Sequence, residues 1–106
     1  MKLEIFFPLY IYMSAQLVLY HTPWCGHCTR FKSNGWGKFK NLVVNETDSK
    51  MSLLIIDEID CQQYPEAAKN INGYPTVILY KNGKAHEYKG NRHENDLYNF
   101  VKLLLK

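Results

Sequence analysis

Two cysteines separated by two residues, Cys25 and Cys28, are the residues of this sequence best suited to chemistry. Cysteines three positions apart in the first turn of a helix lie on one side of it and can close a small disulfide ring. The first of them also faces the free backbone N–H groups and the positive dipole end of the helix, which stabilise a thiolate. Because a thiolate is the nucleophile of thiol–disulfide exchange, this spacing predicts a redox-active pair.

The two residues between the cysteines suit the same chemistry. Gly26 lets the turn close tightly, and His27 can place a positive charge or a hydrogen-bond donor beside the Cys25 thiolate. Stabilising the thiolate favours the dithiol over the disulfide, and the pair is therefore expected to be more oxidising.

A Cys-x-x-Cys pair can also be half of a zinc site, for which His21, His27 and Cys61 are further candidate ligands. Zinc sites of this kind normally repeat the cysteine pair at a set distance, whereas Cys61 stands alone. We therefore expect no metal site, and an inert cysteine pair is the other alternative.

Length and composition limit the class of protein that carries this pair. The 106 residues give room for one domain, and 46% hydrophobic residues are enough for a core. Three cysteines are too few for a disulfide scaffold. The net charge of +3 is small and the basic residues are scattered, which argues against nucleic-acid binding. No segment reaches the roughly 18 apolar residues that a membrane-spanning helix needs.

The elements that must position the cysteines alternate between strands and helices. Continuous apolar runs predict buried strands, and the Asn82-Gly83 dipeptide signals a hairpin. Strands are expected at 16–20, 53–60, 76–80 and 85–89, and helices at 25–42, 65–70 and 94–105. The order β-α-β-α-β-β-α predicts an α/β fold with a four-stranded mixed sheet and helices on both faces.

The first and last of these helices carry the candidate core residues. A break in the first helix is expected near the segment Gly35-Trp36-Gly37, because glycine weakens a helix. The segment 45–49 has the composition of a loop. The candidate core residues are Phe31, Phe39 and Leu42 in the first helix and Leu97, Phe100, Val101 and Leu104 in the last.

Residues 1–14 are an apolar extension ahead of a domain at 15–106. The extension has the outline of a short signal peptide, but Glu4 cancels its single lysine and Pro8 interrupts the apolar run. An added strand or apolar flap is the alternative. The compartment therefore stays open between the cytoplasm and a secretory route.

Three motifs together resemble the catalytic domain of protein disulfide isomerase in the thioredoxin superfamily. They are Pro-Trp-Cys-Gly-His-Cys ending at Cys28, Gly73-Tyr74-Pro75-Thr76, and Tyr88-x-Gly90-x-Arg92 before the last helix. The similarity covers about residues 16–106. It implies a thioredoxin-like fold and a protein-disulfide oxidoreductase or isomerase that exchanges disulfides with protein substrates.

The resemblance also implies roles for individual residues. By that likeness Cys25 is the attacking cysteine, Cys28 resolves the mixed disulfide, and Pro75 is a cis-proline packed against them. No cofactor is implied beyond the redox-active Cys25–Cys28 disulfide. Glutathione or a reductase is a candidate redox partner, and we expect a monomer.

Substrate contacts are implied next to the cis-proline. The resemblance makes Trp24 and the backbone of Tyr74 substrate contacts, with Gly73 and Thr76 in the same motif. An extended peptide that pairs with this backbone would be bound by strand addition, which tolerates varied side chains.

The chain departs from the family pattern in four places. The family has a further strand and helix ahead of the first strand, and it often ends in an ER-retention tetrapeptide that this sequence does not show. A helix-kinking proline is replaced by Ser33, and a buried carboxylate six positions before Cys25 is replaced by Leu19. Two groups could assist Cys28 in its place: the charge of Arg92, which matches a family arginine, or the carboxylate of Glu58.

Two other functions fit the same fold. A glutaredoxin-like enzyme would bind glutathione through basic groups near the cis-proline, for which Lys69 and Arg92 are the candidates. A redox-inert thioredoxin-fold binding module is the alternative from another class.

Overall fold

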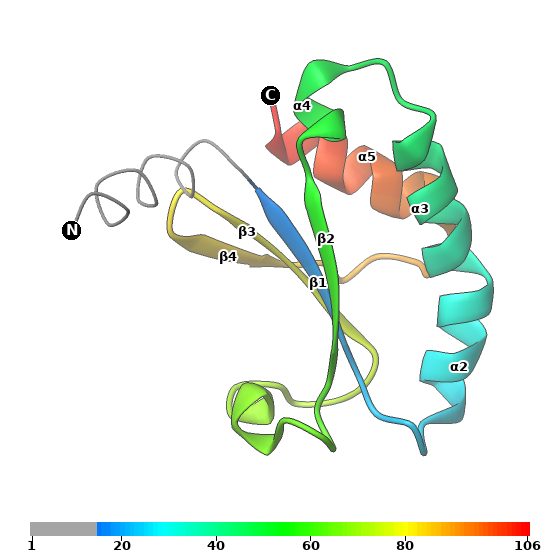
Figure 1. The fold of residues 1–106 in the computed structure, drawn as a ribbon, viewed down its shortest axis with the longest axis vertical. Helices are drawn as coiled ribbons and strands as arrows, with labels where there is room; N and C mark the ends of the chain where they lie inside the picture. Colours follow the sequence, from blue (N-terminus) through cyan, green and yellow to red (C-terminus); the bar gives the residue numbers. More distant parts are fainter. Residues whose placement is uncertain (1–14) are drawn as a thin grey trace.

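A computed structural model describes residues 15–106, and the apolar extension at 1–14 lies outside the described residues. One mixed sheet has the strand order β2-β1-β3-β4. Its strands are β1 (Gln16–His21), β2 (Ile55–Asp60), β3 (Thr76–Lys81) and β4 (Lys84–Glu87). Strand β1 runs parallel to β2 and antiparallel to β3, which is antiparallel to β4. The predicted four-stranded mixed sheet is therefore confirmed (Figure 1).

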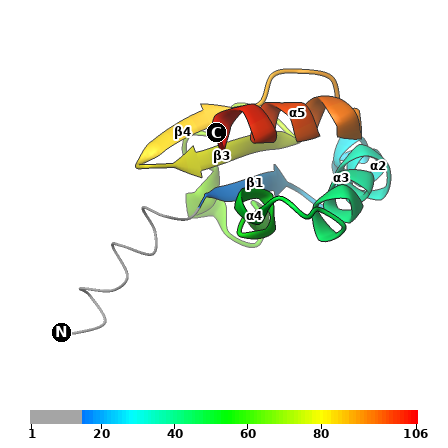
Figure 2. The same cartoon turned by 90° about the horizontal axis from the view of Figure 1, so that it is seen from above.

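Helices flank this sheet unequally. They are α2 (Gly26–Ser33), α3 (Gly35–Val44), α4 (Ser49–Ser52), the 3-10 helix η1 (Pro65–Ala68) and α5 (Glu94–Leu104). Figure 1 shows α2 and α3 on one side of the strands and η1 on the other, and Figure 2 shows α2 and α3 together from above.

Alternation along the strands divides the apolar side chains between two clusters, because successive residues of a strand point to opposite faces. Leu17 and Leu19 of β1 belong to the larger cluster, whereas Val18 and Tyr20 belong to the smaller one. The larger cluster takes its other fully buried side chains from β3 and the helices. These include Trp36, Phe39, Met51, Leu79, Leu97 and Val101. The main core therefore lies between the sheet and α3 and α5.

The smaller cluster covers the other face with much less material. Val18, Tyr20 and Cys61 are buried there, and Ala67 and Ala68 of η1 pack against them. The helix predicted for 65–70 is a single 3-10 turn that begins at Pro65, where a proline needs no hydrogen-bond partner for its nitrogen.

The single helix predicted for 25–42 is two helices. Asn34 interrupts it with φ −115° and ψ −100°, and α3 then begins at Gly35. Gly35 has a reason to be glycine, because a Cβ there would lie 2.0 Å from the carbonyl oxygen of Arg92. The break falls close to the predicted position. The absence of a side chain at Gly35 lets the loop that carries Arg92 pack against the junction between α2 and α3.

Other local predictions divide into correct and wrong ones. Asn82 and Gly83 both have positive φ, as the predicted hairpin requires. Leu42 is 37% exposed, so its prediction as a core residue is wrong. Helix α4 follows a segment predicted as loop, because the Asp48 side chain accepts the backbone N–H of Lys50 and starts a short turn.

The last helix is close to its prediction. It spans Glu94–Leu104, and Leu97 and Val101 are fully buried on its inner face. Leu104 is half-buried, and the neighbouring Leu105 is buried instead.

Candidate functional site

The two cysteines lie at the junction between β1 and α2. Cys25 is the N-cap of α2, and its sulfur accepts a hydrogen bond from the backbone N–H of Cys28 at 3.2 Å. Both side chains are buried, with 8% exposure at Cys25 and 1% at Cys28. Cys25 is therefore the more accessible of the two, and both are free thiols in this structure.

The surroundings shift the pKa values of the two thiols in opposite directions. Burial alone would raise the pKa of Cys25, but hydrogen bonds from Cys28 and from the His27 backbone, with the charge of Arg92, lower it below its ordinary value. Burial raises the pKa of Cys28 to about 11, and its hydrogen bond with Cys25 acts in the same direction. One thiolate and one thiol is the ionisation that exchange chemistry needs at this pair.

The loop before β3 completes the wall around Cys25. The Tyr74–Pro75 peptide bond is cis, as predicted, and the Cys25 thiol donates to the Tyr74 carbonyl oxygen at 3.7 Å. The Thr76 hydroxyl donates to the Gly73 carbonyl at 2.7 Å and tightens this loop.

An aromatic pair flanks the same opening. The Trp24 side chain is 70% exposed, and its ring lies edge-on to that of Tyr74, with centroids 6.0 Å apart. The motif residues of the two loops are thus brought together, and they leave the Tyr74 backbone beside an exposed aromatic surface.

His27 has a partner that the sequence analysis missed. The Arg30 guanidinium lies 2.9 Å from His27 Nδ1, one helical turn further along α2. Because arginine only donates, Nδ1 is the acceptor in this pair. The three-residue spacing on a helix was the signal that could have found it.

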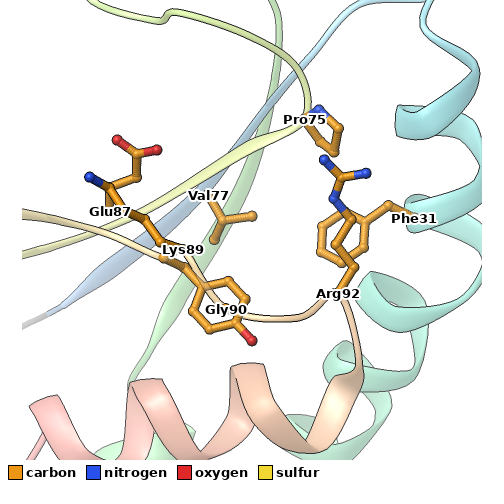
Figure 3. Close-up of a pocket in the computed structure, with 8 residues that line it drawn as sticks. Phe31, Pro75, Val77, Glu87, Lys89, Gly90 and Arg92 are labelled. Atoms are coloured by element: carbon orange, nitrogen blue, oxygen red, sulfur yellow. The ribbon is translucent and has the colours of Figure 1, made fainter.

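Arg92 lies in the loop between β4 and α5, where its charge lowers the pKa of both Cys25 and Cys28. Figure 3 shows its guanidinium pointing toward Pro75, past the Phe31 ring. Beside it is an open cavity of about 220 Å³, lined by Phe31, Pro75, Val77, Glu87, Tyr88, Lys89, Gly90 and Arg92. The predicted position of Arg92 near the cysteines is therefore consistent with the structure.

Glu58 does not serve the role suggested for it. Its carboxylate accepts from Trp36 Nε1 at 2.9 Å and pairs with Lys40 at 2.8 Å and Lys32 at 3.4 Å. Burial would raise the pKa of Glu58, but these partners lower it to about 2. A carboxylate held so firmly in its charged form is a poor acceptor for the Cys28 proton, and we drop that hypothesis.

Thr22 is the second residue that sequence reasoning missed. It is 4% exposed, and its hydroxyl has no hydrogen-bond partner among residues 15–106. Its backbone carbonyl accepts the N–H of Cys25 at 3.3 Å. No pattern in the sequence singles this threonine out.

Neither a metal-binding cluster nor a membrane-spanning helix is present in the described part of the chain. Within residues 15–106, no three His, Cys, Asp or Glu side chains lie close enough together to hold a metal ion. None of the helices in that range is both long and apolar enough to cross a membrane.

A dithiol at the start of a helix, opposite a cis-proline on a mixed four-stranded sheet, defines a thioredoxin-like domain. Residues 9–103 match the model of the Thioredoxin family, and the chain belongs to that family. Its homologues are thioredoxin domains of protein disulfide isomerases, which supports thiol–disulfide oxidoreductase chemistry at the level of the family.

Named relatives agree with this assignment. The chain is 35% identical over 89 residues to the protein disulfide-isomerase of Saccharomyces cerevisiae, covering 81% of this chain and 16% of the yeast protein. It is 34% identical over 87 residues to the human protein disulfide-isomerase TMX3, covering 80% of this chain and 18% of that protein. The chain thus spans less than a fifth of the length of these two relatives.

Solved structures show the same fold. The J-Trx1 fragment of ERdj5 superposes with a TM-score of 0.76 at 23% identity, covering 94% of this chain and 47% of that one. The first thioredoxin domain of mouse protein disulfide-isomerase A4 gives 0.73 at 24% identity, covering 87% and 64%.

Proposed function

We propose that this chain is a thiol–disulfide oxidoreductase that acts on protein substrates through Cys25 and Cys28. The observation that carries the proposal is the geometry of the pair: the Cys25 sulfur caps α2, accepts the backbone N–H of Cys28 at 3.2 Å and lies beside the cis Tyr74–Pro75 bond, with Cys28 more deeply buried behind it. The pKa directions agree with it, lowered at Cys25 and raised at Cys28. These features support attack by Cys25 and resolution by Cys28.

The reaction has two exchange steps. The Cys25 thiolate attacks a substrate disulfide, forms a mixed disulfide and releases one substrate sulfur as a thiolate. The Cys28 thiolate then attacks the Cys25 sulfur, which releases the second substrate sulfur and leaves the Cys25–Cys28 disulfide. The substrate is reduced and the pair is oxidised, and the reverse sequence inserts a disulfide into a dithiol protein.

Substrate binding is proposed at the loop before β3. An extended peptide can pair with the backbone of Tyr74 next to Cys25, while the exposed Trp24 ring supplies apolar contact. Backbone pairing reads no particular side chain, so the site is expected to accept varied protein segments.

An insulin-reduction assay with dithiothreitol as the electron source tests the proposal. We expect turnover by the wild type, loss in Cys25→Ser, and retention in Cys61→Ala, which removes the buried thiol outside the site. Equal and negligible turnover by the wild type and Cys25→Ser would support a redox-inert binding module instead.

A further inference from the structure

The Thr22 hydroxyl is a buried polar group without an assigned role. It lies in the turn between β1 and α2, is 4% exposed, and has no hydrogen-bond partner among residues 15–106. Burying an unpaired hydroxyl is unfavourable, so a group of this kind in a folded protein requires an explanation. A valine of the same shape would avoid the cost.

The backbone of Thr22 lies beside the cysteine pair. Its carbonyl accepts the N–H of Cys25 at 3.3 Å, and the Cys25 sulfur in turn accepts the backbone N–H of Cys28 at 3.2 Å. The Thr22 backbone also acts to lower the pKa of Cys28, against the larger effect of burial. The unpaired hydroxyl therefore sits on a residue bonded to the first cysteine of the pair and close enough to influence the second.

A thiolate at Cys28 needs a hydrogen-bond donor, because the side chain is 1% exposed and few other groups stabilise its charge. Leu19 is fully buried and cannot accept a proton, and the Glu58 carboxylate is bonded to Trp36 and two lysines. Among the groups that act on Cys28, only the Arg92 charge and the Thr22 backbone favour its thiolate. A thiolate formed in this volume is poorly stabilised unless another donor turns toward it.

We propose that the Thr22 hydroxyl donates a hydrogen bond to the Cys28 thiolate while the mixed disulfide is resolved. The inference rests on the proposed exchange function. Rotation about the Cα–Cβ bond between staggered positions is the movement required, since the Thr22 backbone is already in place.

Atoms and electrons balance in this step. The Cys28 proton passes to solvent, and Thr22 keeps its own proton while it stabilises the sulfur charge. A Cys25–Cys28 bond forms, the bond from Cys25 to the substrate sulfur breaks, and that sulfur leaves as a thiolate with the electron pair.

The test uses an aromatic disulfide whose released thiolate absorbs visible light, mixed with the reduced protein in a stopped-flow instrument. In a Cys61→Ala background, the first release reports attack by Cys25 and the second reports resolution by Cys28. The variants are Thr22→Val, which keeps the shape, and Thr22→Ser, which keeps the hydroxyl. Thr29→Val is the matched control, because it removes an exposed hydroxyl next to Cys28 that donates to the Cys25 carbonyl.

We expect Thr22→Val to slow the second release about tenfold at neutral pH, as the loss of a hydrogen bond to a charged group implies. The midpoint of its pH profile is expected to rise by about one unit, while the first release changes less than twofold. Thr22→Ser should restore the wild-type second phase, and Thr29→Val should match the wild type.

Two results would overturn the inference: an unchanged second release in Thr22→Val, or an equal slowing of both releases, which would indicate a general disturbance of the turn. Thermal unfolding of Thr22→Val adds an independent reading. We expect its stability to be at least that of the wild type, because an unpaired buried hydroxyl is removed. A wild type that releases no coloured thiolate from Cys25 would contradict the proposed function itself and remove the basis of the inference.

Discussion

Leu19 of β1 and Glu58 of β2 are direct Cα partners across the parallel strand pair. Of these two facing positions, only the one on β2 carries a carboxylate. Glu58 is also tied to α2 and α3 through Lys32, Lys40 and Trp36. At the position where the protein disulfide isomerase family has a buried carboxylate, this chain has a fully buried leucine. The carboxylate thus joins the helices to the sheet and does not serve Cys28.

Glu58→Gln should lower the free energy of unfolding at pH 7 by about 1 kcal/mol, a figure reduced because both lysines are partly exposed. The native pKa is about 2, below the ordinary value of 4.5. The stabilisation is therefore complete above pH 4.5 and is lost as the pH falls toward 2. Urea unfolding of both proteins at several pH values measures it, with Glu66→Gln in η1 as the control. A difference that persists unchanged at pH 2 would contradict the ion-pair explanation.

His27→Pro should make the pair more reducing by roughly 1–3 kcal/mol, at about 1.4 kcal/mol per 30 mV. The hydrogen bond from the backbone N–H of His27, which helps to lower the pKa of Cys25, disappears because proline has no N–H. The imidazole is lost as well. The wild type is expected nearer about −180 mV than about −270 mV. Equilibration with glutathione gives both potentials, and His27→Ala, which keeps the N–H, separates the two contributions. An unchanged potential in His27→Pro would contradict the assignment.

Arg92→Ala should raise the pKa of both thiols, since the Arg92 charge favours both thiolates. Resolution of the mixed disulfide is expected to slow by about tenfold, equivalent to about 1.4 kcal/mol. The two releases of the aromatic disulfide assay measure this effect. Lys89→Ala, which removes another cation from the wall of the same cavity, is the control and should match the wild type.

Gly35→Ala should destabilise the fold by about 2 kcal/mol, because its Cβ would overlap the Arg92 carbonyl oxygen at 2.0 Å. Relief of the overlap moves the Arg92 loop, so slower resolution is expected as well. Chemical unfolding tests the first effect. Gly37→Ala, whose Cβ would meet the Lys32 carbonyl at 2.9 Å, should cost less. Equal stability of Gly35→Ala and the wild type would argue against this close approach.

Alkylation by iodoacetamide should distinguish the two active-site thiols by pH. Cys25 is expected to react with a midpoint below its ordinary value of 9.0, and Cys28 with a midpoint near 11. The raised pKa of Cys28 contributes stability that is complete below pH 9 and lost between 9 and 11. Mass spectrometry of the two peptides follows each reaction, and unfolded protein, where both midpoints should coincide, is the control.

The sequence by itself determined the sheet, the hairpin and the redox motif. Apolar runs specify strands, and β1 is buried on both faces as such a run predicts. The prediction that the run at 53–60 is a buried strand is wrong, because β2 (Ile55–Asp60) is an edge strand without a buried residue. Asn82-Gly83 specifies the turn because both residues tolerate positive φ. The Cys25 and Cys28 spacing is a local relationship, readable as soon as a helix is assigned to it.

Only the tertiary structure decided which distant groups assist the cysteines. Leu19 and Glu58 are far apart in the chain and become partners through the register of a parallel strand pair. Gly35 lies against Arg92 only because the chain is interrupted at Asn34, between α2 and α3. Whether the Thr22 hydroxyl has a hydrogen-bond partner depends on all the residues that pack around it. Contacts of this kind arise from packing between elements, whose angles and distances no local pattern of residue types encodes.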